Sequence, residues 1–153
     1  VILRPTTVFG PYAYETQWKA IYNLAKRNIK IKIGGESLVY SKDLARIVNI
    51  STKGKFDGKW LYVNWPEIID LEKVSSKTCE YFGKKRCITI PLKGLIKLSY
   101  HITPYSSPVK MIYRSIKGSY IFKSKYLEDF KFAPFEEAFN DFINYAVNSN
   151  FRP

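Results

Sequence analysis

The sequence predicts an α/β fold in which short strands alternate with helices. Short runs of β-branched and apolar residues are bounded by glycine and proline, and the longer segments between them repeat apolar residues at helical spacing. Hydrophobic residues make up 46% of the chain, and no apolar run reaches the roughly 20 residues needed to cross a bilayer. We therefore expect residues 1–153 to form one globular fragment without an internal repeat, a linker or a membrane partner.

The first predicted strand is the apolar run Val1–Leu3, which Arg4–Pro5 and then the turn Gly10–Pro11 bring to an end. A run of this kind is typical of a strand that is buried on both faces of a parallel sheet. Chain termini normally lie at the surface, so a buried strand is an unusual place for one. We therefore expect that further polypeptide precedes Val1.

Five later segments have the apolar spacing of helices. Ser41 is expected to cap the helix at residues 40–51, with Asp43 near the positive end of its dipole. Gly83 is expected to end the helix at residues 70–85. Tyr22 and Tyr81 are expected to pack in the core. The five segments are residues 14–28, 40–51, 70–85, 92–102 and 135–148. The other positions at inward-facing helical spacing are Tyr14, Trp18, Ile21, Ala25, Leu71, Val74, Thr78, Phe135, Phe139, Phe142, Ile143 and Ala146.

Strands are predicted between these helices, at residues 29–35, 59–65 and 86–91. The first of them alternates isoleucine with lysine and stops at Gly34–Gly35. Parallel strands joined through helices form βαβ units, which is the arrangement expected for this chain.

The formal net charge is +12, and no acidic residue occurs between Glu80 and Glu128. This excess indicates either a lysine-rich solvated surface or a potential that attracts a nucleotide diphosphate, nucleic acid or an acidic membrane. Cys79 and Cys87 flank a Gly-Lys-Lys-Arg turn and are expected to be a reduced pair in a cytoplasmic protein, with a disulfide as the alternative. His101 is the only histidine, so no histidine-based metal site or Ser-His-Asp triad is expected within this chain.

Four segments, in order, carry a resemblance to a known family. Residues 3–11 read LRPTTVFGP, close to Arg-Pro-x-x-Val-Tyr/Phe-Gly-Pro, and residues 38–48 read LVYSKDLARIV. They are followed by WLYVNWPEIIDLEKVSSKTCEYFGKK at 60–85 and SKYLEDFKFAPFEEAFNDFINY at 124–145. Together they resemble the extended short-chain dehydrogenase/reductases, the branch that holds the NAD-dependent sugar epimerases and dehydratases.

The resemblance implies the C-terminal portion of a Rossmann-type enzyme, namely the end of the Rossmann core and the substrate-binding lobe. The N-terminal half that binds most of the NAD or NADP would be absent, together with its glycine-rich turn and its catalytic Tyr-x-x-x-Lys. This chain alone is therefore expected to be inactive. The intact protein is expected to be an isomerase or oxidoreductase that acts on a nucleotide sugar or another anionic small molecule, with a homodimer as a further possibility.

The resemblance also assigns candidate binding residues. Pro5 and Thr6 would flank the nicotinamide, and Thr7 would occupy the position of an Asn that touches the substrate phosphate. Phe9 would shape the substrate side, and Arg114 is a candidate for the substrate diphosphate because guanidinium groups suit phosphate oxygens. For Thr6 and Thr7 the alternative is ordinary strand-end hydrogen bonding to the backbone. Asp43 matches a family aspartate and is expected to hold a helix start.

Three Tyr-x-x-x-Lys matches within the chain, Tyr22/Lys26, Tyr81/Lys85 and Tyr113/Lys117, are attributed to chance. Glu36 lies where many sugar-nucleotide members carry a phosphate-binding Arg. A reductase-type member with a non-sugar substrate is therefore an alternative. Further alternatives are a basic polyanion- or nucleic-acid-binding domain, motivated by aromatic residues among the cations, and a partner-binding remnant without chemistry.

Overall fold

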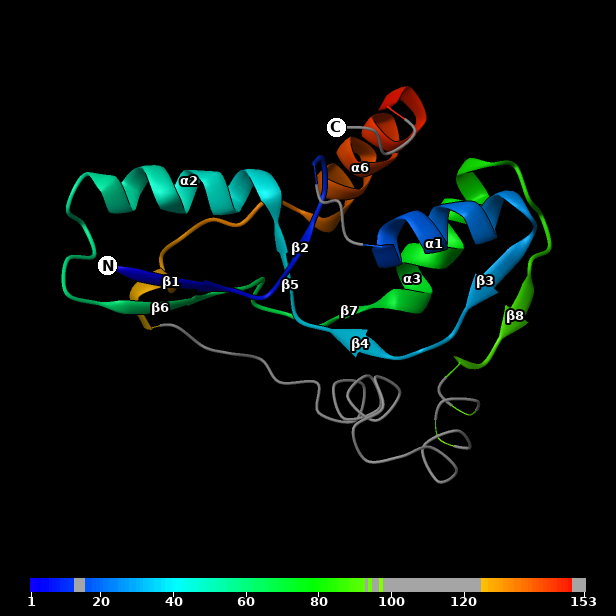
Figure 1. Ribbon diagram of the computed structural model, residues 1–153, viewed down its shortest axis with the longest axis horizontal. Coiled ribbons are helices and arrows are strands. Elements are labelled where there is room, and N and C mark those ends of the chain that lie inside the picture. Colours follow the sequence, from blue (N-terminus) through cyan, green and yellow to red (C-terminus); the bar gives the residue numbers. More distant parts are fainter. Residues whose placement is uncertain (13–15, 93, 95–96, 98–124, 150–153) are drawn as a thin grey trace. The chain divides into compact units, whose positions relative to one another are not determined.

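The computed structural model describes residues 1–12, 16–92, 94, 97 and 125–149 (Figure 1). The described residues form an α/β fold with strands paired in parallel, as the sequence predicts. They divide into two compact units, each of which is considered by itself. Unit 1 comprises Val1–Lys19, Ser37–Glu67 and Ile121–Pro153, and unit 2 comprises Ala20–Glu36 and Ile68–Tyr120.

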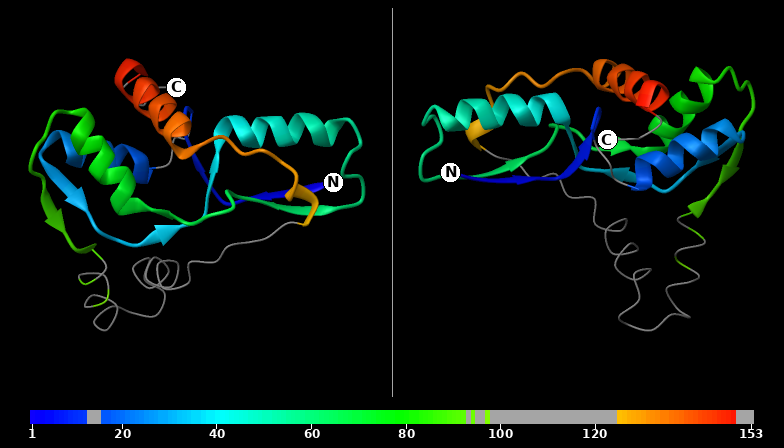
Figure 2. Two further views of the ribbon diagram at one scale, coloured as in Figure 1. Left: turned by 180° about the vertical axis from the view of Figure 1, so that it is seen from behind. Right: turned by 45° about the horizontal axis from the view of Figure 1, so that its top comes forward.

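Unit 1 contains two parallel strand pairs. β1 (Ile2–Pro5) pairs with β6 (Trp60–Val63), and β2 (Thr7–Phe9) pairs with β5 (Leu38–Tyr40). Helix α2 (Ser41–Thr52) connects β5 to β6 and lies along β1 and β6, which run side by side in all views (Figures 1 and 2). The core between them consists of Val39, Ile47, Phe56, Leu61, Val63 and Leu127.

The burial predicted for the first strand is wrong. Val1 is 48% exposed and Ile2 is 46% exposed, although Leu3 packs against the core of unit 1. The reason is that, among the described residues, β1 has β6 as its only strand neighbour, so its outer edge and one face remain open. On that face the guanidinium group of Arg4 lies 4.4 Å from the ring centroid of Trp60, whose side chain is 60% exposed.

Helix α6 (Phe135–Ser149) packs its phenylalanines against Phe9 in the core of unit 1. A 3-10 turn, Lys125–Leu127, precedes it. The apolar face predicted for this helix is confirmed. Its buried residues are Phe135, Ala138, Phe139, Phe142, Ile143 and Ala146.

In unit 2, β3 (Ile29–Ile31) pairs in parallel with β8 (Ile88–Ile90), and β4 (Gly35–Glu36) pairs antiparallel with β7 (Ile69–Asp70). The single strand predicted for residues 29–35 is therefore two strands, separated where Gly34 adopts a φ of +117°. A Cβ on Gly35 would lie 2.3 Å from the Cγ2 of Ile68, so any other residue there would require Ile68 to shift.

Helix α1 (Thr16–Lys26) begins in unit 1 and ends in unit 2. The core positions predicted on it that fall within the described residues are all buried, including Tyr22. The ammonium group of Lys26 lies over the ring of Tyr22, 4.5 Å from its centroid. This Tyr-x-x-x-Lys pair is thus part of the packing of its own helix.

Helix α3 (Leu71–Tyr81) follows β7 directly. Asp70 caps it by accepting a hydrogen bond from the backbone N–H of Glu72 at 2.9 Å. The predicted end at Gly83 is confirmed, because Gly83 has a φ of +67° immediately after the C-cap residue Phe82. The core position predicted for Tyr81 is wrong, since its side chain is 51% exposed at the last residue of α3.

The prediction that the cysteines are reduced is also wrong. Cys79 in α3 and Cys87 immediately before β8 form a disulfide, with their Cα atoms 6.8 Å apart. Sequence spacing alone could not decide this, because the pairing depends on how the Gly83 turn brings the chain back beside the helix.

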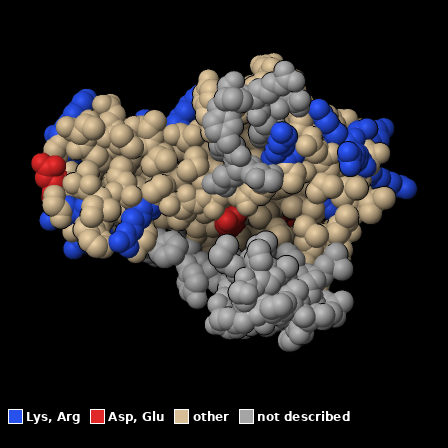
Figure 3. All heavy atoms as spheres, in the orientation of Figure 1, with Lys and Arg blue, Asp and Glu red and all other residues tan. Residues whose placement is uncertain are grey.

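Several predicted features lie outside the described residues: Arg114, His101, Tyr113/Lys117 and most of the helix at 92–102. The described part of the acid-free stretch contributes Lys84, Lys85, Arg86, Lys97 and Lys125. Figure 3 shows basic side chains on both units and few acidic ones on the same face. Within the part of the chain that the structure describes, no helix is long and apolar enough to cross a membrane.

Candidate ligand-binding site

The candidate cofactor residues lie at the carboxyl end of β1. Pro5 is exposed and is in register with Val63 of β6. The backbone N–H of Thr6 donates to the carbonyl oxygen of Val63 at 3.1 Å, and the Thr6 hydroxyl donates to the same oxygen at 3.3 Å. The strand-end bonding considered for Thr6 is therefore present. Its half-buried hydroxyl retains its acceptor lone pairs.

The candidate substrate residues lie on β2. Thr7 is half-buried and in register with Leu38 of β5, whereas Phe9 is completely buried. The Phe9 ring has an edge contact with Trp18 at 4.9 Å between centroids and lies 5.0 Å from Phe142. Phe9 is thus a core residue in unit 1, and Thr7 is the more accessible of the two.

The turn after β2 depends on a glycine. Gly10 has a φ of +121°, and a Cβ there would lie 2.9 Å from both the Ser41 Oγ and the Tyr40 Cδ2. An L side chain at this position would meet both steric and conformational strain. The Gly-Pro sequence that ends the first motif therefore brings the end of β2 against the end of β5.

A group of polar residues that the sequence did not single out lies at this same end of β5. The hydroxyl of Tyr40 donates to the carboxylate of Asp141 on α6, and the ammonium group of Lys42 forms an ion pair with the same carboxylate. Tyr40 and Lys42 fall within a recognised motif. Asp141 lies 101 residues after Tyr40 and carries no local signal that could have linked them.

The charges of these three groups are well defined. Burial, reinforced by Asp141, raises the pKa of Tyr40 above its ordinary value, so the phenol stays neutral and serves as a donor. The Lys42 and Tyr40 hydrogen bonds lower the pKa of Asp141, and the bond with Asp141 raises the pKa of Lys42. The cluster is therefore a carboxylate held by one neutral and one cationic donor, with Lys42 exposed to solvent.

Asp43 lies in the first turn of α2, as predicted, and also makes contacts that the sequence did not predict. Its carboxylate accepts a hydrogen bond from the backbone N–H of Ala133 at 2.8 Å and forms an ion pair with Arg46 at 2.8 Å. The side chain is 1% exposed, so Asp43 joins α2 to the segment that precedes α6. The N-cap predicted at Ser41 is wrong, because Tyr40 occupies the N-cap position and makes no side-chain cap bond.

Two further polar residues follow β6 at the same end of the strands. The Asn64 side-chain amide donates to the carbonyl oxygen of Trp65 at 2.6 Å. The indole N–H of Trp65 is buried and has no hydrogen-bond partner among the described residues. A buried donor without a partner is unfavourable, so this N–H can donate a hydrogen bond to a water or to a ligand oxygen.

In unit 1, Thr6 follows the carboxyl end of β1 and Thr7 begins β2, whereas the Tyr40–Lys42–Asp141 cluster lies at the carboxyl end of β5, beside the end of β2. In open α/β sheets ligands bind at this edge. Among the described residues no group of His, Cys, Asp and Glu could hold a metal ion. The charge of Lys42 is balanced by Asp141, and a donor still without a partner among the described residues is the indole N–H of Trp65, which suits an oxygen atom of a ligand.

No protein-family model matches the chain, and no curated protein matches it in sequence. Solved structures do resemble it. The structure of gox2253 matches 99% of the chain with a TM-score of 0.72 and 16% identity, and the chain covers 50% of that protein. A GDP-L-fucose synthetase from Naegleria fowleri bound to NADP matches 97% of the chain with a TM-score of 0.62 and 14% identity, and the chain covers 45% of it.

The Bordetella bronchiseptica enzyme WbmG, in complex with NAD, matches 97% of the chain with a TM-score of 0.59 and 13% identity. The chain covers 44% of WbmG, and so spans about half the length or less of each of these proteins. At these identities the likeness concerns the fold. The chain therefore has the α/β fold found in the C-terminal half of these Rossmann-type enzymes.

Proposed function

We propose that this chain is the C-terminal, substrate-binding part of an extended short-chain dehydrogenase/reductase, of the NAD(P)-dependent epimerase/dehydratase type, that acts on a nucleotide sugar. The observation that carries the proposal is the likeness of 97% of the chain to WbmG, which was crystallised with NAD and also with NAD and UDP. The four motifs of the sequence support it, because they occur in the family's order along nearly the whole chain.

This chain would contact only the nicotinamide end of the cofactor. It contains no Gly-x-x-Gly-x-x-Gly turn to hold the pyrophosphate, so the N-terminal half of the enzyme would have to supply that contact. Pro5 and Thr6 are the residues that would flank the nicotinamide. A bound nicotinamide would supply hydride transfer at a sugar carbon. The chain alone is therefore expected not to catalyse the reaction.

Substrate recognition is assigned to the edge of unit 1. The hydroxyl of Thr7 would donate to a phosphate oxygen, with Phe9 packed behind it in the core. Arg114, by its charge, would bind the substrate diphosphate.

The N-terminal half is proposed as the partner of the open side of β1 and β6. Ile2, Arg4 and Trp60 present exposed apolar and aromatic surface there, which is the kind of surface that a covering element buries. Without such a cover, an exposed strand edge favours self-association. A cytoplasmic location and a homodimer remain part of the proposal.

The decisive experiment is calorimetric titration of the intact protein with UDP-, GDP- and dTDP-sugars in the presence of NAD or NADP. We expect one of these to bind, and Thr7→Val to weaken its binding about tenfold, the loss of one hydrogen bond to a charged group. Thr52→Val, which alters an exposed threonine on α2, is the matched control and should bind as the wild type. If the intact protein binds the nicotinamide cofactor but none of these sugars, a reductase with a non-sugar substrate replaces this proposal.

A further inference from the structure

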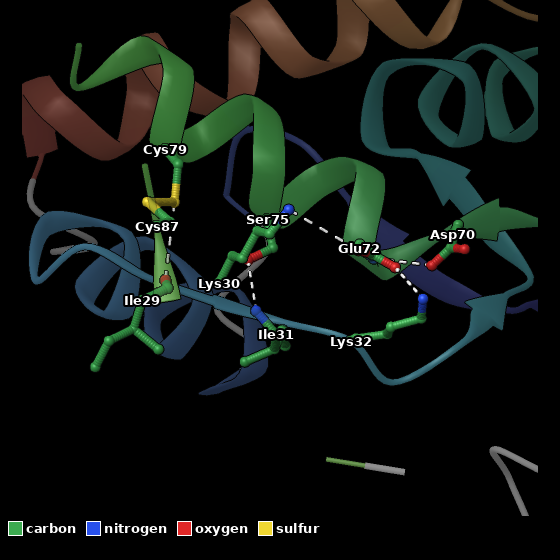
Figure 4. Close-up of polar contacts among 9 residues, drawn as sticks. All are labelled: Ile29, Lys30, Ile31, Lys32, Asp70, Glu72, Ser75, Cys79 and Cys87. Carbon is green, nitrogen blue, oxygen red and sulfur yellow. Dashed lines mark hydrogen bonds and ion pairs between the residues drawn. A yellow bond between two sulfur atoms is a disulfide. The ribbon is translucent and has the colours of Figure 1, made fainter. Parts of the chain in front are cut away.

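The disulfide of unit 2 joins helix α3 to the residue that precedes the short, mostly exposed strand β8 (Figure 4). We propose that the Cys79–Cys87 bond is a reversible redox clasp, which holds β8 against β3 when it is closed and releases β8 when it is reduced, while α3 stays docked on β3.

Helix α3 is held on β3 by contacts that do not involve the disulfide. The backbone N–H of Ile31 donates to the Ser75 hydroxyl at 3.0 Å in a buried position. The backbone N–H of Leu71 donates to the carbonyl oxygen of Gly34 at 3.1 Å. Glu72 adds an ion pair with Lys32 at 3.5 Å. The beginning and middle of α3 therefore have their own attachment.

Among the described residues, strand β8 is attached to β3 through backbone pairing, from Ile29↔Ile88 to Ile31↔Ile90. It is three residues long, and Ile88 is 70% exposed, so the strand buries little apolar surface. Its link to β3 includes the bond from the N–H of Ile88 to the carbonyl of Asn28, at 2.8 Å, and that from the N–H of Lys32 to the carbonyl of Ile90, at 3.0 Å. A short strand of this kind is marginally stable in water unless something else restrains it. The bond from Cys79 to Cys87 is that restraint, because Cys87 immediately precedes the strand.

The two sulfur atoms are suited to opening and closing. Cys79 is 3% exposed, whereas Cys87 is partly exposed and can be reached by a thiol. The Cys79 Sγ lies 3.8 Å from the carbonyl oxygen of Ile29, so the thiol formed on reduction has an acceptor ready. Lys84, Lys85 and Arg86 directly precede Cys87 in sequence, and positive charge near a sulfur favours its thiolate.

The chemistry is a thiol–disulfide exchange with a small dithiol as reductant. A thiolate of the dithiol attacks the Sγ of Cys87 and breaks the Cys79–Cys87 bond, leaving a mixed disulfide on Cys87 and a thiol on Cys79. The second thiol of the dithiol then displaces Cys87. Two electrons and two protons pass to the protein, and the dithiol becomes a cyclic disulfide.

Neighbouring amides in β3 give a sharp test, because the Lys32 amide depends on β8 and the Ile31 amide depends on α3. Residue-resolved hydrogen exchange is measured on the chain in oxidised and in reduced dithiothreitol. We expect the Lys32 and Ile88 amides to exchange at least tenfold faster after reduction, with the Ile31 and Leu71 amides unchanged. The double variant Cys79→Ser/Cys87→Ser should give the fast rates in both buffers.

Three results would overturn the proposal. Lys32 and Ile88 could exchange equally fast in both buffers, or Ile31 and Leu71 could accelerate together with them, which would mean that the whole unit opens. Alkylation of the denatured chain after acid quenching could find both thiols free in oxidising buffer. This last measurement needs no folded variant. It is also independent of the proposed enzyme activity, so failure here and failure of nucleotide-sugar binding are distinguishable.

Discussion

The hydroxyl of Tyr40 at the end of β5 donates to the carboxylate of Asp141 on α6, 101 residues further along the chain. Tyr40 is buried and its pKa is raised, so it acts as a neutral donor to a charged acceptor. This bond joins the strand that precedes α2 to the C-terminal helix and fixes the charged end of unit 1.

Tyr40→Phe should lower the free energy of unfolding by about 1 kcal/mol, because it removes the donor and leaves the ring in place. Urea unfolding followed by circular dichroism measures the change. Lys42→Gln should have a smaller effect, since Lys42 is exposed and its ion pair is screened by solvent. An equal or larger loss in Lys42→Gln would mean that the ion pair, rather than the phenol, holds α6.

Acid should destabilise the wild type more than Asp141→Asn. The pKa of Asp141 is lowered in the folded state, chiefly by Lys42, so its contribution is present above the ordinary value of 3.8 and is lost as the pH falls through the lower folded value. Unfolding free energies of both proteins, measured from pH 6 down to pH 2 in the same ionic strength, test this. Parallel curves for the two proteins would show that Asp141 has no such linkage.

Gly10→Ala should lower stability by about 2 kcal/mol or more, since it combines an unfavourable φ with contacts to Tyr40 and Ser41. Gly58→Ala is the matched control. Gly58 has a φ of +70° but a Cβ there would meet nothing within 4 Å, so only the conformational cost of about 1 kcal/mol applies. Thermal unfolding of the two variants should rank them in this order, and the reverse order would contradict the close approach at Gly10.

Asp43→Ala should cost about 2–3 kcal/mol, because it leaves the N–H of Ala133 and the guanidinium group of Arg46 without their buried acceptor. Asp57→Ala, the same change at an exposed aspartate in the loop after α2, should be nearly neutral. Urea unfolding at neutral pH compares them. Similar losses in both variants would argue against a specific role for the bond to Ala133.

Trp60→Glu should reduce self-association of the chain, because it places a charge on the open side of β1 and β6. Val147→Glu adds the same charge to an exposed position on α6 and should leave association unchanged. Light scattering over a range of concentrations distinguishes them. If both charges are equally effective, net charge rather than this sheet face controls association.

The sequence predicted helices well where apolar residues repeat at regular spacing over several turns. The apolar face of α6 is an example, because a fifteen-residue helix gives several turns of regular spacing. The division of residues 29–36 into β3 and β4 could not be predicted from spacing, because a single glycine with a positive φ, Gly34, interrupts an otherwise regular alternation.

The candidate site was only partly predictable. Thr6 and Thr7 follow from a motif at one place in the chain, whereas Asp141 enters the site through the packing of α6 on unit 1. The exposure of Tyr81 was missed because it lies at the last turn of α3, where helical spacing no longer decides which side is covered. The disulfide was missed because sequence spacing does not encode the distance between two sulfur atoms.

The positions of the three tryptophans have an optical consequence. Trp18 and Trp65 are buried beside Phe9, whereas Trp60 is largely in water, and all three belong to unit 1. Intrinsic fluorescence should contain a blue-shifted component that iodide cannot quench and a red-shifted component from Trp60 that it can. Because unit 2 contains no tryptophan, selectively excited tryptophan emission reports on unit 1 without a label.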